Sequence, residues 1–164
     1  MMGAATANVH DNNVAVGYYA LKVLTTGDNN VAIGSGAGDA ITTGENNTTV
    51  GTNAAGALTT GSSNVAIGRQ AFDAAAVGES DNIAIGVNAL GTVDEGTAGG
   101  DADFNIAIGT NALLGGDFAG ANNQLQGNIA IGAYALDGTT TNAHTGSIAI
   151  GHQSLKAKNL ASGS

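Results

Sequence analysis

The stretch VAIGSGAGDA, residues 31–40, is the part of the sequence that comes closest to a chemical motif. A β-branched run leads into Gly34 and Gly36, and a glycine-rich loop after a strand often holds a nucleotide phosphate. The dinucleotide fingerprint, however, needs a small residue where Asp39 stands and a helix after it, whereas the following residues lack a 3.6-residue apolar period. A phosphate loop would also need a lysine after its last glycine, and none is present. We therefore expect no nucleotide cofactor and no enzyme active site here.

The remaining candidates for chemistry are three histidines and one acidic cluster. His10, His144 and His152 are scattered along the chain, and no pair has a metal-ligand spacing such as H-x-x-x-H. The chain has no cysteine, which excludes disulfides and thiol chemistry. These residues predict neither a metal site nor a nucleophile.

The acidic cluster lies in a loop-like segment and raises the question of calcium. It consists of Asp94, Glu95, Asp101 and Asp103. Oxygen-rich loops can bind calcium, but this spacing matches neither an EF-hand nor the nonapeptide calcium repeat. We expect solvated surface charge, because acidic loop residues are usually just exposed.

The glycine stretch is one copy of a core that recurs along nearly the whole chain. The core reads VAVG, VAIG, TTVG or IAIG, and it occupies residues 14–17, 31–34, 48–51, 65–68, 83–86, 106–109, 129–132 and 148–151. An asparagine precedes every copy except the last, which Ser147 precedes, and Ala or Ser follows three residues after each closing glycine. Eight in-phase copies indicate a structural repeat rather than a phosphate loop.

The repeat unit N-[VI]-A-[VI]-G-x-x-A-L has the pattern of a short strand closed by a glycine turn. Period two sends Val and Ile to one side of the strand and Ala to the other. We expect a second short strand around A-L, followed by turn-forming Thr, Gly, Asp and Asn. Such coils would stack at about 4.8 Å into a rod of roughly 33 Å, with the asparagines forming a ladder.

The side of the strand that carries alanine is predicted to be a contact surface between chains. Each coil offers few large side chains to its interior, and thin cores are marginal. A flat alanine stripe would let a second chain approach closely. The predicted trimer-interface residues are Ala15, Ala32, Ala66, Ala84, Ala107, Ala130 and Ala149. The alternative is that alanine merely fits a narrow solenoid.

The unit N-x-V-A-I-G-x-x-A resembles the head repeat of trimeric autotransporter adhesins, and NNVAVGYYALKVLTTGDNNVAIG also resembles a repeat of phage tail-fibre proteins. The resemblance covers residues 11–155. It implies an all-β fold, a β-solenoid of the left-handed parallel β-roll type with about eight coils, assembling as a side-by-side homotrimer. The chain departs from the adhesin pattern in its longer later coils, and we expect from its sequence no stalk heptads, no membrane anchor and no self-cleaving chaperone domain.

Composition bounds the partners and the location. The net charge is −9 with only four Lys and Arg, so we expect no nucleic-acid binding. No apolar run reaches the roughly 18 residues of a membrane span, and residues 1–13 show no basic segment followed by an apolar one, so we expect no signal peptide there. We expect a virion protein, with the bacterial cell surface as the alternative. Residues 1–10 and 156–164 would join the repeat domain to other virion or appendage proteins.

Three insertions in the later coils are the predicted attachment region. They span residues 91–104, 114–127 and 137–147 and follow the same strand of consecutive coils, so they should cluster on one face. The predicted contacts with a host glycan or protein are Phe104, Asp117, Phe118, Asn122, Asn123 and Tyr134. The alternative is that the Phe side chains tuck under their own loops.

The sequence thus predicts a non-catalytic structural protein of a phage particle: a short fibre, spike or decoration protein with a possible role in host attachment. The alternative is the head of a bacterial trimeric adhesin that binds matrix protein or glycan. The interpretation of the chain as a small-molecule enzyme loses its main support, because the glycine-rich stretch does not match a phosphate-binding loop. A monomeric ice-binding solenoid is a fourth reading, but the paired threonines before glycine have the pattern of turns rather than of a flat T-x-T array.

Overall fold

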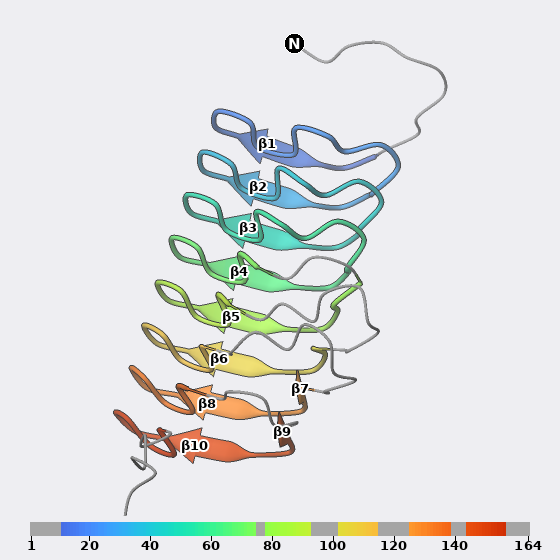
Figure 1. Ribbon diagram of the computed structural model, residues 1–164. Coiled ribbons are helices and arrows are strands. Elements are labelled where there is room, and N and C mark those ends of the chain that lie inside the picture. Colours follow the sequence, from blue (N-terminus) through green and yellow to red (C-terminus); the bar gives the residue numbers. More distant parts are fainter. Residues whose placement is uncertain (1–10, 75–77, 93–101, 115–124, 139–143, 157–164) are drawn as a thin grey trace, which may run out of the picture.

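The computed structural model describes residues 11–74, 78–92, 102–114, 125–138 and 144–156. The chain is an all-β solenoid that adds one short strand to a single parallel sheet at each pass (Figure 1). The eight strands of this sheet are, in order, β1 (Val14–Val16), β2 (Val31–Ile33), β3 (Thr48–Val50), β4 (Val65–Ile67), β5 (Ile83–Ile85), β6 (Ile106–Ile108), β8 (Ile129–Ile131) and β10 (Ile148–Ile150). The predicted β-solenoid is confirmed.

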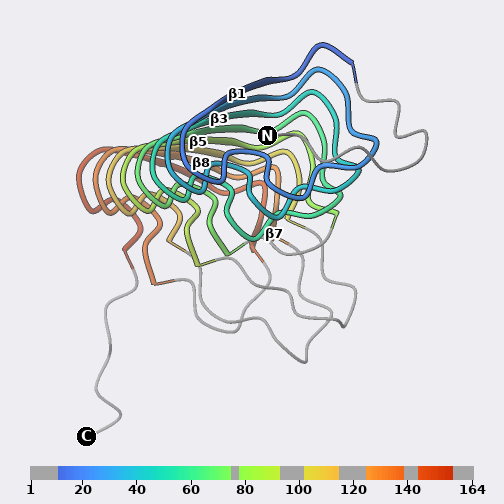
Figure 2. The same ribbon diagram turned by 90° about the horizontal axis from the view of Figure 1, so that it is seen from above.

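The sheet keeps one register from end to end. Each copy of the core pairs with the same positions of its neighbours, so Ala32 lies opposite Ala15 on one side and Thr49 on the other. Seen from above, successive strands lie one behind another with a steady offset (Figure 2). The insertions do not interrupt this sheet, because β5, β6, β8 and β10 pair in the same way as the regular coils.

Two further strands, which the sequence pattern did not predict, lie just before the last two copies of the core. β7 (Leu125–Gln126) pairs in parallel with β9 (His144–Thr145). Residues 102–104, 125–127 and 144–147, predicted as the ends of insertions, therefore sit in the regular stack, as the bonds Gly127 N to Asp103 O and Gly146 N to Gln126 O show.

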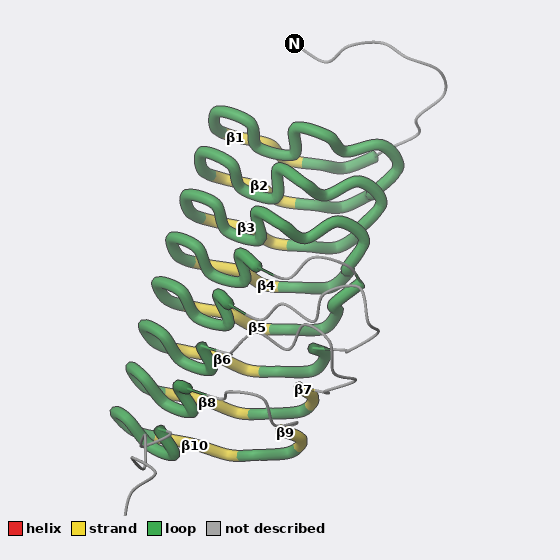
Figure 3. The backbone as a smooth tube through the Cα atoms, viewed as in Figure 1, coloured by secondary structure: helices red, strands yellow, loops and turns green. Residues whose placement is uncertain are grey.

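The second strand predicted around A-L is wrong. Leu90 has φ 50° and Phe72 has φ 55°, which is left-handed rather than extended backbone. Their N–H groups still donate to the next coil, Leu90 to the carbonyl of Ala112 and Phe72 to that of Ala89. The physical reason is that G-x-x-A-L reverses the chain within a few residues, so the large side chain enters the interior from a turn. In Figure 3 the strands of the eight-stranded sheet form one column, with β7 and β9 apart from it, and most of each coil is loop.

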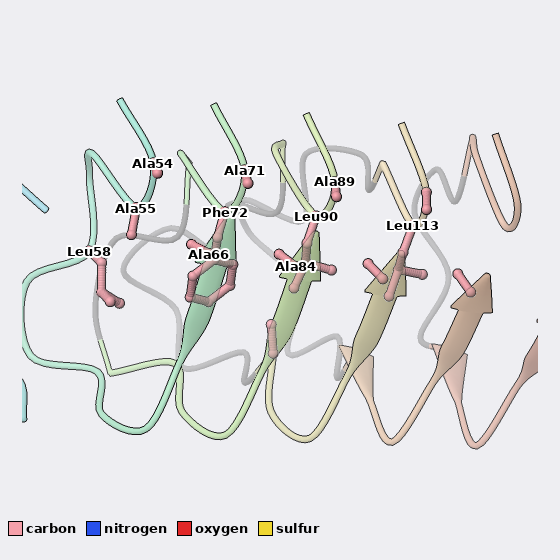
Figure 4. Close-up of a cluster of buried hydrophobic side chains, with 14 of the residues drawn as sticks. Ala54, Ala55, Leu58, Ala66, Ala71, Phe72, Ala84, Ala89, Leu90 and Leu113 are labelled. Carbon is pink, nitrogen blue, oxygen red and sulfur yellow. The ribbon is translucent and has the colours of Figure 1, made fainter. Parts of the chain in front are cut away.

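The core lies between the strand alanines and this column of large side chains. Ala66 and Ala84 are fully buried beside Phe72 and Leu90 (Figure 4). A third row, which includes Ile41 and Leu58, closes the interior from the far turn of the coil. Because the interior is narrow, each strand of the eight-stranded sheet contributes only an alanine methyl group to it, except β3, which contributes Thr49.

A column of stacked asparagines seals one corner of the core, as the sequence predicts. Asn64 is fully buried, and its Oδ1 accepts hydrogen bonds from the backbone N–H of Asn82 at 3.0 Å and from Asn82 Nδ2 at 3.2 Å. Its own Nδ2 donates to Asn47 Oδ1 at 3.1 Å and to the carbonyl of Glu79 at 2.8 Å. The ladder runs from Asn13 to Asn128, whose Oδ1 accepts from the N–H of Ser147.

Candidate assembly face and attachment residues

The alanines predicted as a trimer interface do not form an outer surface. Six of the seven are buried within a single chain, with exposed fractions of 0–2%: Ala32, Ala66, Ala84, Ala107, Ala130 and Ala149. Ala15 is exposed because its strand is the first of the sheet. The alternative reading, that alanine fits a narrow solenoid, describes their position. The interface prediction is wrong for these six residues, because the large column that includes Phe72 and Leu90 already covers their face.

The outward face of the sheet carries the larger side chains instead. Two side chains of each strand flank the inward one and point away from the core, as the alternating burial of the strands shows. We call this column the Val/Ile stripe. It consists of Val14, Val16, Val31, Ile33, Thr48, Val50, Val65, Ile67, Ile83, Ile85, Ile106, Ile108, Ile129, Ile131, Ile148 and Ile150.

The Val/Ile stripe carries no charged residue and is apolar at every position except Thr48. Its members are half-buried or exposed; Ile33, for example, keeps 41% of its surface exposed. At the usual strand spacings the stripe measures roughly 33 Å by 10 Å, about 330 Å², which is comparable to the largest apolar patch on a typical monomeric protein. Single exposed aliphatic residues are normal, whereas a contiguous apolar patch of this size is often a functional surface.

Phe104 is the predicted attachment residue that the structure places most clearly. It occupies a column of exposed positions with left-handed backbone, whose members are Asn12, Asn29, Asn46, Ser63, Asp81, Phe104, Gly127 and Gly146. Asn, Asp or Gly, which tolerate positive φ, fill this column except at Ser63 and at Phe104, where φ is 61° and 62% of the residue is exposed. Gly127 is the next member of this column after Phe104. A Cβ built on Gly127 would meet nothing within 4 Å, so there is open space at that position.

Tyr134 lies in another column and is not brought next to Phe104. It follows the closing glycine of β8, whereas Phe104 precedes β6, so the two residues flank opposite ends of the strands. Lys156 Nζ lies 4.5 Å from the centre of the Tyr134 ring and 3.1 Å from Asp137 Oδ2. His152 packs edge-on against the same ring at 6.3 Å. The predicted contacts Asp117, Phe118, Asn122 and Asn123 lie outside the described residues.

Where the structure describes them, the polar groups considered for metal or nucleotide binding are not gathered into a site. In the described part of the chain no three His, Asp or Glu side chains group as metal ligands. Asp103 uses its Oδ1 to accept the N–H of Ser80 at 2.7 Å, while Asp94, Glu95, Asp101 and His10 lie outside the described residues. Burial raises the pKa of the Asp73 carboxyl on another coil.

The glycine-rich stretch is structural. Gly34 has φ 139°, and a Cβ there would lie 2.5 Å from the carbonyl oxygen of Gly51 on the next coil. Turns rather than a helix follow it, so no helix N-terminus faces the loop. The paired threonines are also turn residues, since the Thr25 hydroxyl donates to the carbonyl of Thr42, and the Thr42 hydroxyl to that of Thr59.

Comparison of the chain with family models, with curated proteins and with solved structures finds no match. Among the described residues there is also no helix that could cross a lipid bilayer.

Proposed function

We propose that this chain is a non-catalytic structural protein whose copies associate side by side into a parallel homotrimer through the Val/Ile stripe. The observation that carries the proposal is the stripe itself, an uncharged apolar column along the whole outward face of the sheet. A second copy fits this surface best, because it offers a column of the same length and the same spacing.

Assembly would remove the stripe from water, and burial of apolar surface is the main favourable term in association. Each chain would keep its own closed core of alanine and large aliphatic side chains, so the trimer would be a bundle of finished rods. The proposal includes the eight coils and the left-handed winding that the repeats predict. None of the stripe positions is charged, and the net charge of −9 for each chain would keep the bundle soluble.

We place this rod in a phage particle, as a short fibre, spike or decoration protein, because the longer repeat form resembles that of phage tail fibres. Its role would be to present attachment residues at a host surface, with exposed Phe104 as the contact for a host glycan or protein. The adhesin head of a bacterial surface protein is the second candidate, favoured by the shorter N-x-V-A-I-G-x-x-A unit.

The test introduces charge into the stripe. Ile85→Asp together with Ile108→Asp places carboxylates on adjacent strands at half-buried outward positions. The chain should keep its fold, because both side chains point away from the core, but it should sediment as a monomer. The matched control is Ser35→Asp with Thr52→Asp, which adds the same charge at exposed positions outside the stripe and should leave a trimer.

Analytical ultracentrifugation with circular dichroism separates the outcomes. A folded monomer for the stripe variant and a trimer for the control support the proposal. A stripe variant that sediments like the unmodified trimer would show that another surface holds the chains together.

A further inference from the structure

Thr48 is the one polar residue of the Val/Ile stripe. It lies on β3, where the usual V-A-I is replaced by T-T-V. Its neighbour Thr49 points inward, is 1% exposed, and donates its hydroxyl to the carbonyl of Val31 at 3.3 Å. The Thr48 side chain points outward and is half-buried, and its hydroxyl has no hydrogen-bond partner within the described residues. The two adjacent threonines are therefore in different situations.

A repetitive apolar stripe does not by itself fix how two copies align. If one chain slides along another by one strand, about 4.8 Å, nearly every Val or Ile meets another Val or Ile. Flat apolar contacts of this kind specify register weakly, and a single polar residue in an apolar seam is the known device for specifying it. The aliphatic residues of the stripe therefore do not fix the axial register of one chain against another.

We propose that Thr48 sets the axial register and the parallel orientation of the chains in their assembly. This inference rests on the proposed trimer. With the chains parallel and in register, the Thr48 side chains of neighbouring copies lie at one level and can donate to one another. After a slip of one strand each hydroxyl would face Val31 or Val65, which are the partners of Thr48 in the sheet register. An antiparallel copy would bring it against β6, where both outward residues are isoleucine.

A buried hydroxyl without a partner is costly, whereas a pair of hydroxyls that meet each other is satisfied. The misaligned states are therefore disfavoured more strongly than the aligned one is stabilised. The size of the stripe residues also differs between the two ends of the sheet, which distinguishes a parallel from an antiparallel arrangement of chains. The first outward position is valine on β1, β2 and β4 but isoleucine on β5, β6, β8 and β10. This gradient distinguishes the two ends, and Thr48 marks a single level between them.

Disulfide trapping measures the register directly, because the chain has no cysteine of its own. Chains carrying Val65→Cys and chains carrying Ile83→Cys are mixed, refolded together and oxidised. These positions are direct partners in the sheet and so lie one strand apart in the same column. Disulfides between like positions report the aligned state, and mixed 65–83 disulfides report a slip. Ile67→Cys with Ile85→Cys repeats the experiment on the second column.

With Thr48 present we expect disulfides between like positions, identified by mass spectrometry of the linked peptides. In a Thr48→Val background the mixed disulfide should rise about tenfold or more, the change expected when no hydroxyl is left unpaired by a slip. Thr48→Ser keeps the hydroxyl and should preserve the like pairs. Thr52→Val removes a threonine of the same coil that lies outside the stripe and should change nothing.

A variant with the threonine moved to another strand tests whether the effect comes from the position of the hydroxyl or from the loss of Thr48 as such. The double variant Val31→Thr with Thr48→Val moves the polar level by one strand in every copy, so it should restore the like pairs. Like pairs in Thr48→Val at the same proportion as in the unmodified chain would overturn the register inference and leave the trimer standing. A monomeric unmodified chain would instead overturn the proposed function, and the inference with it.

Discussion

At the scale of single residues, the stacked asparagines do the work that strand pairing does elsewhere. Each of the strands is only two or three residues long, so the coil corners must satisfy their backbone groups in another way. Asn64 does so by bonding the N–H of Asn82 and the carbonyl of Glu79 on the next coil. Because asparagine recurs in every coil except the last, where Ser147 stands, each of these amides both accepts from and donates to a neighbouring coil.

Replacing Asn64 with alanine should therefore be strongly destabilising. Two buried backbone groups, the N–H of Asn82 and the carbonyl of Glu79, would lose their partners, which costs about 3 kcal/mol in total. Asn13→Ala should cost only about 1 kcal/mol, because Asn13 is half-buried at the end of the ladder and water can replace it. Urea unfolding measures both values. Equal losses at the two positions would contradict the account of the ladder.

Replacing Phe104 should stabilise the fold, in contrast to replacing Asn64, because Phe104 is exposed and its left-handed backbone is strained. Phe104→Asn should raise the free energy of unfolding by about 1 kcal/mol, because asparagine tolerates the left-handed φ of 61° better than phenylalanine. The reverse change in the same column, Asn46→Phe, should lower it by a similar amount. A loss of stability on Phe104→Asn would mean that the ring contributes to the stability of the fold rather than being an exposed contact residue.

The residue scale is also where reasoning from the sequence went wrong. The period of two correctly separated Val and Ile from Ala, but size suggested that the larger residues face the core. Ala84 shows why this fails: the turn residue Leu90 enters the interior from the other side and leaves room for a methyl group only. No local sequence pattern predicts that Leu90 lies in a left-handed turn.

At the scale of the elements, a column of glycines closes every strand and sets how closely the coils approach. Gly68 has φ 133°, and a Cβ there would lie 2.5 Å from the carbonyl oxygen of Gly86. The same close contact recurs from Gly17 to Gly132 along the stack. The turn therefore requires glycine for two reasons, the backbone angle and the space.

Gly68→Ala should accordingly cost more than about 3 kcal/mol or prevent folding, since the clash is with backbone that cannot move aside. Gly127→Ala is the matched control, because its φ is 64° and a Cβ there would meet nothing within 4 Å. It should cost only about 1 kcal/mol from the left-handed backbone. Chemical denaturation of both variants decides the matter, and a mild effect at Gly68 would refute the packing argument.

The elements were predictable where the repeat is strict. The positions of the eight strands, their parallel order and the asparagine ladder all follow from one in-phase pattern. The short pair β7 and β9 was not predictable, because Leu125–Gln126 and His144–Thr145 share no residue type and are two residues long. Their pairing depends on the stack that the cores have already built.

At the scale of the whole molecule, the described residues form a rod with a closed core, and none of them covers the outward face of the sheet. The Val/Ile stripe runs along the full sheet, while the alanines and large turn residues are already buried. A sequence-based prediction of association was reasonable, but it chose the wrong face because it assigned the inside and outside of the strand in reverse. The trimer remains a prediction, and it now depends on the stripe.

The molar mass of the unmodified chain in solution tests this account most directly. Light scattering on a sizing column should give about 47 kDa, three times the chain mass of 15.8 kDa, and the value should persist on dilution. A mass of 15.8 kDa for a folded chain would contradict the account, because the Val/Ile stripe would then face water along the whole rod.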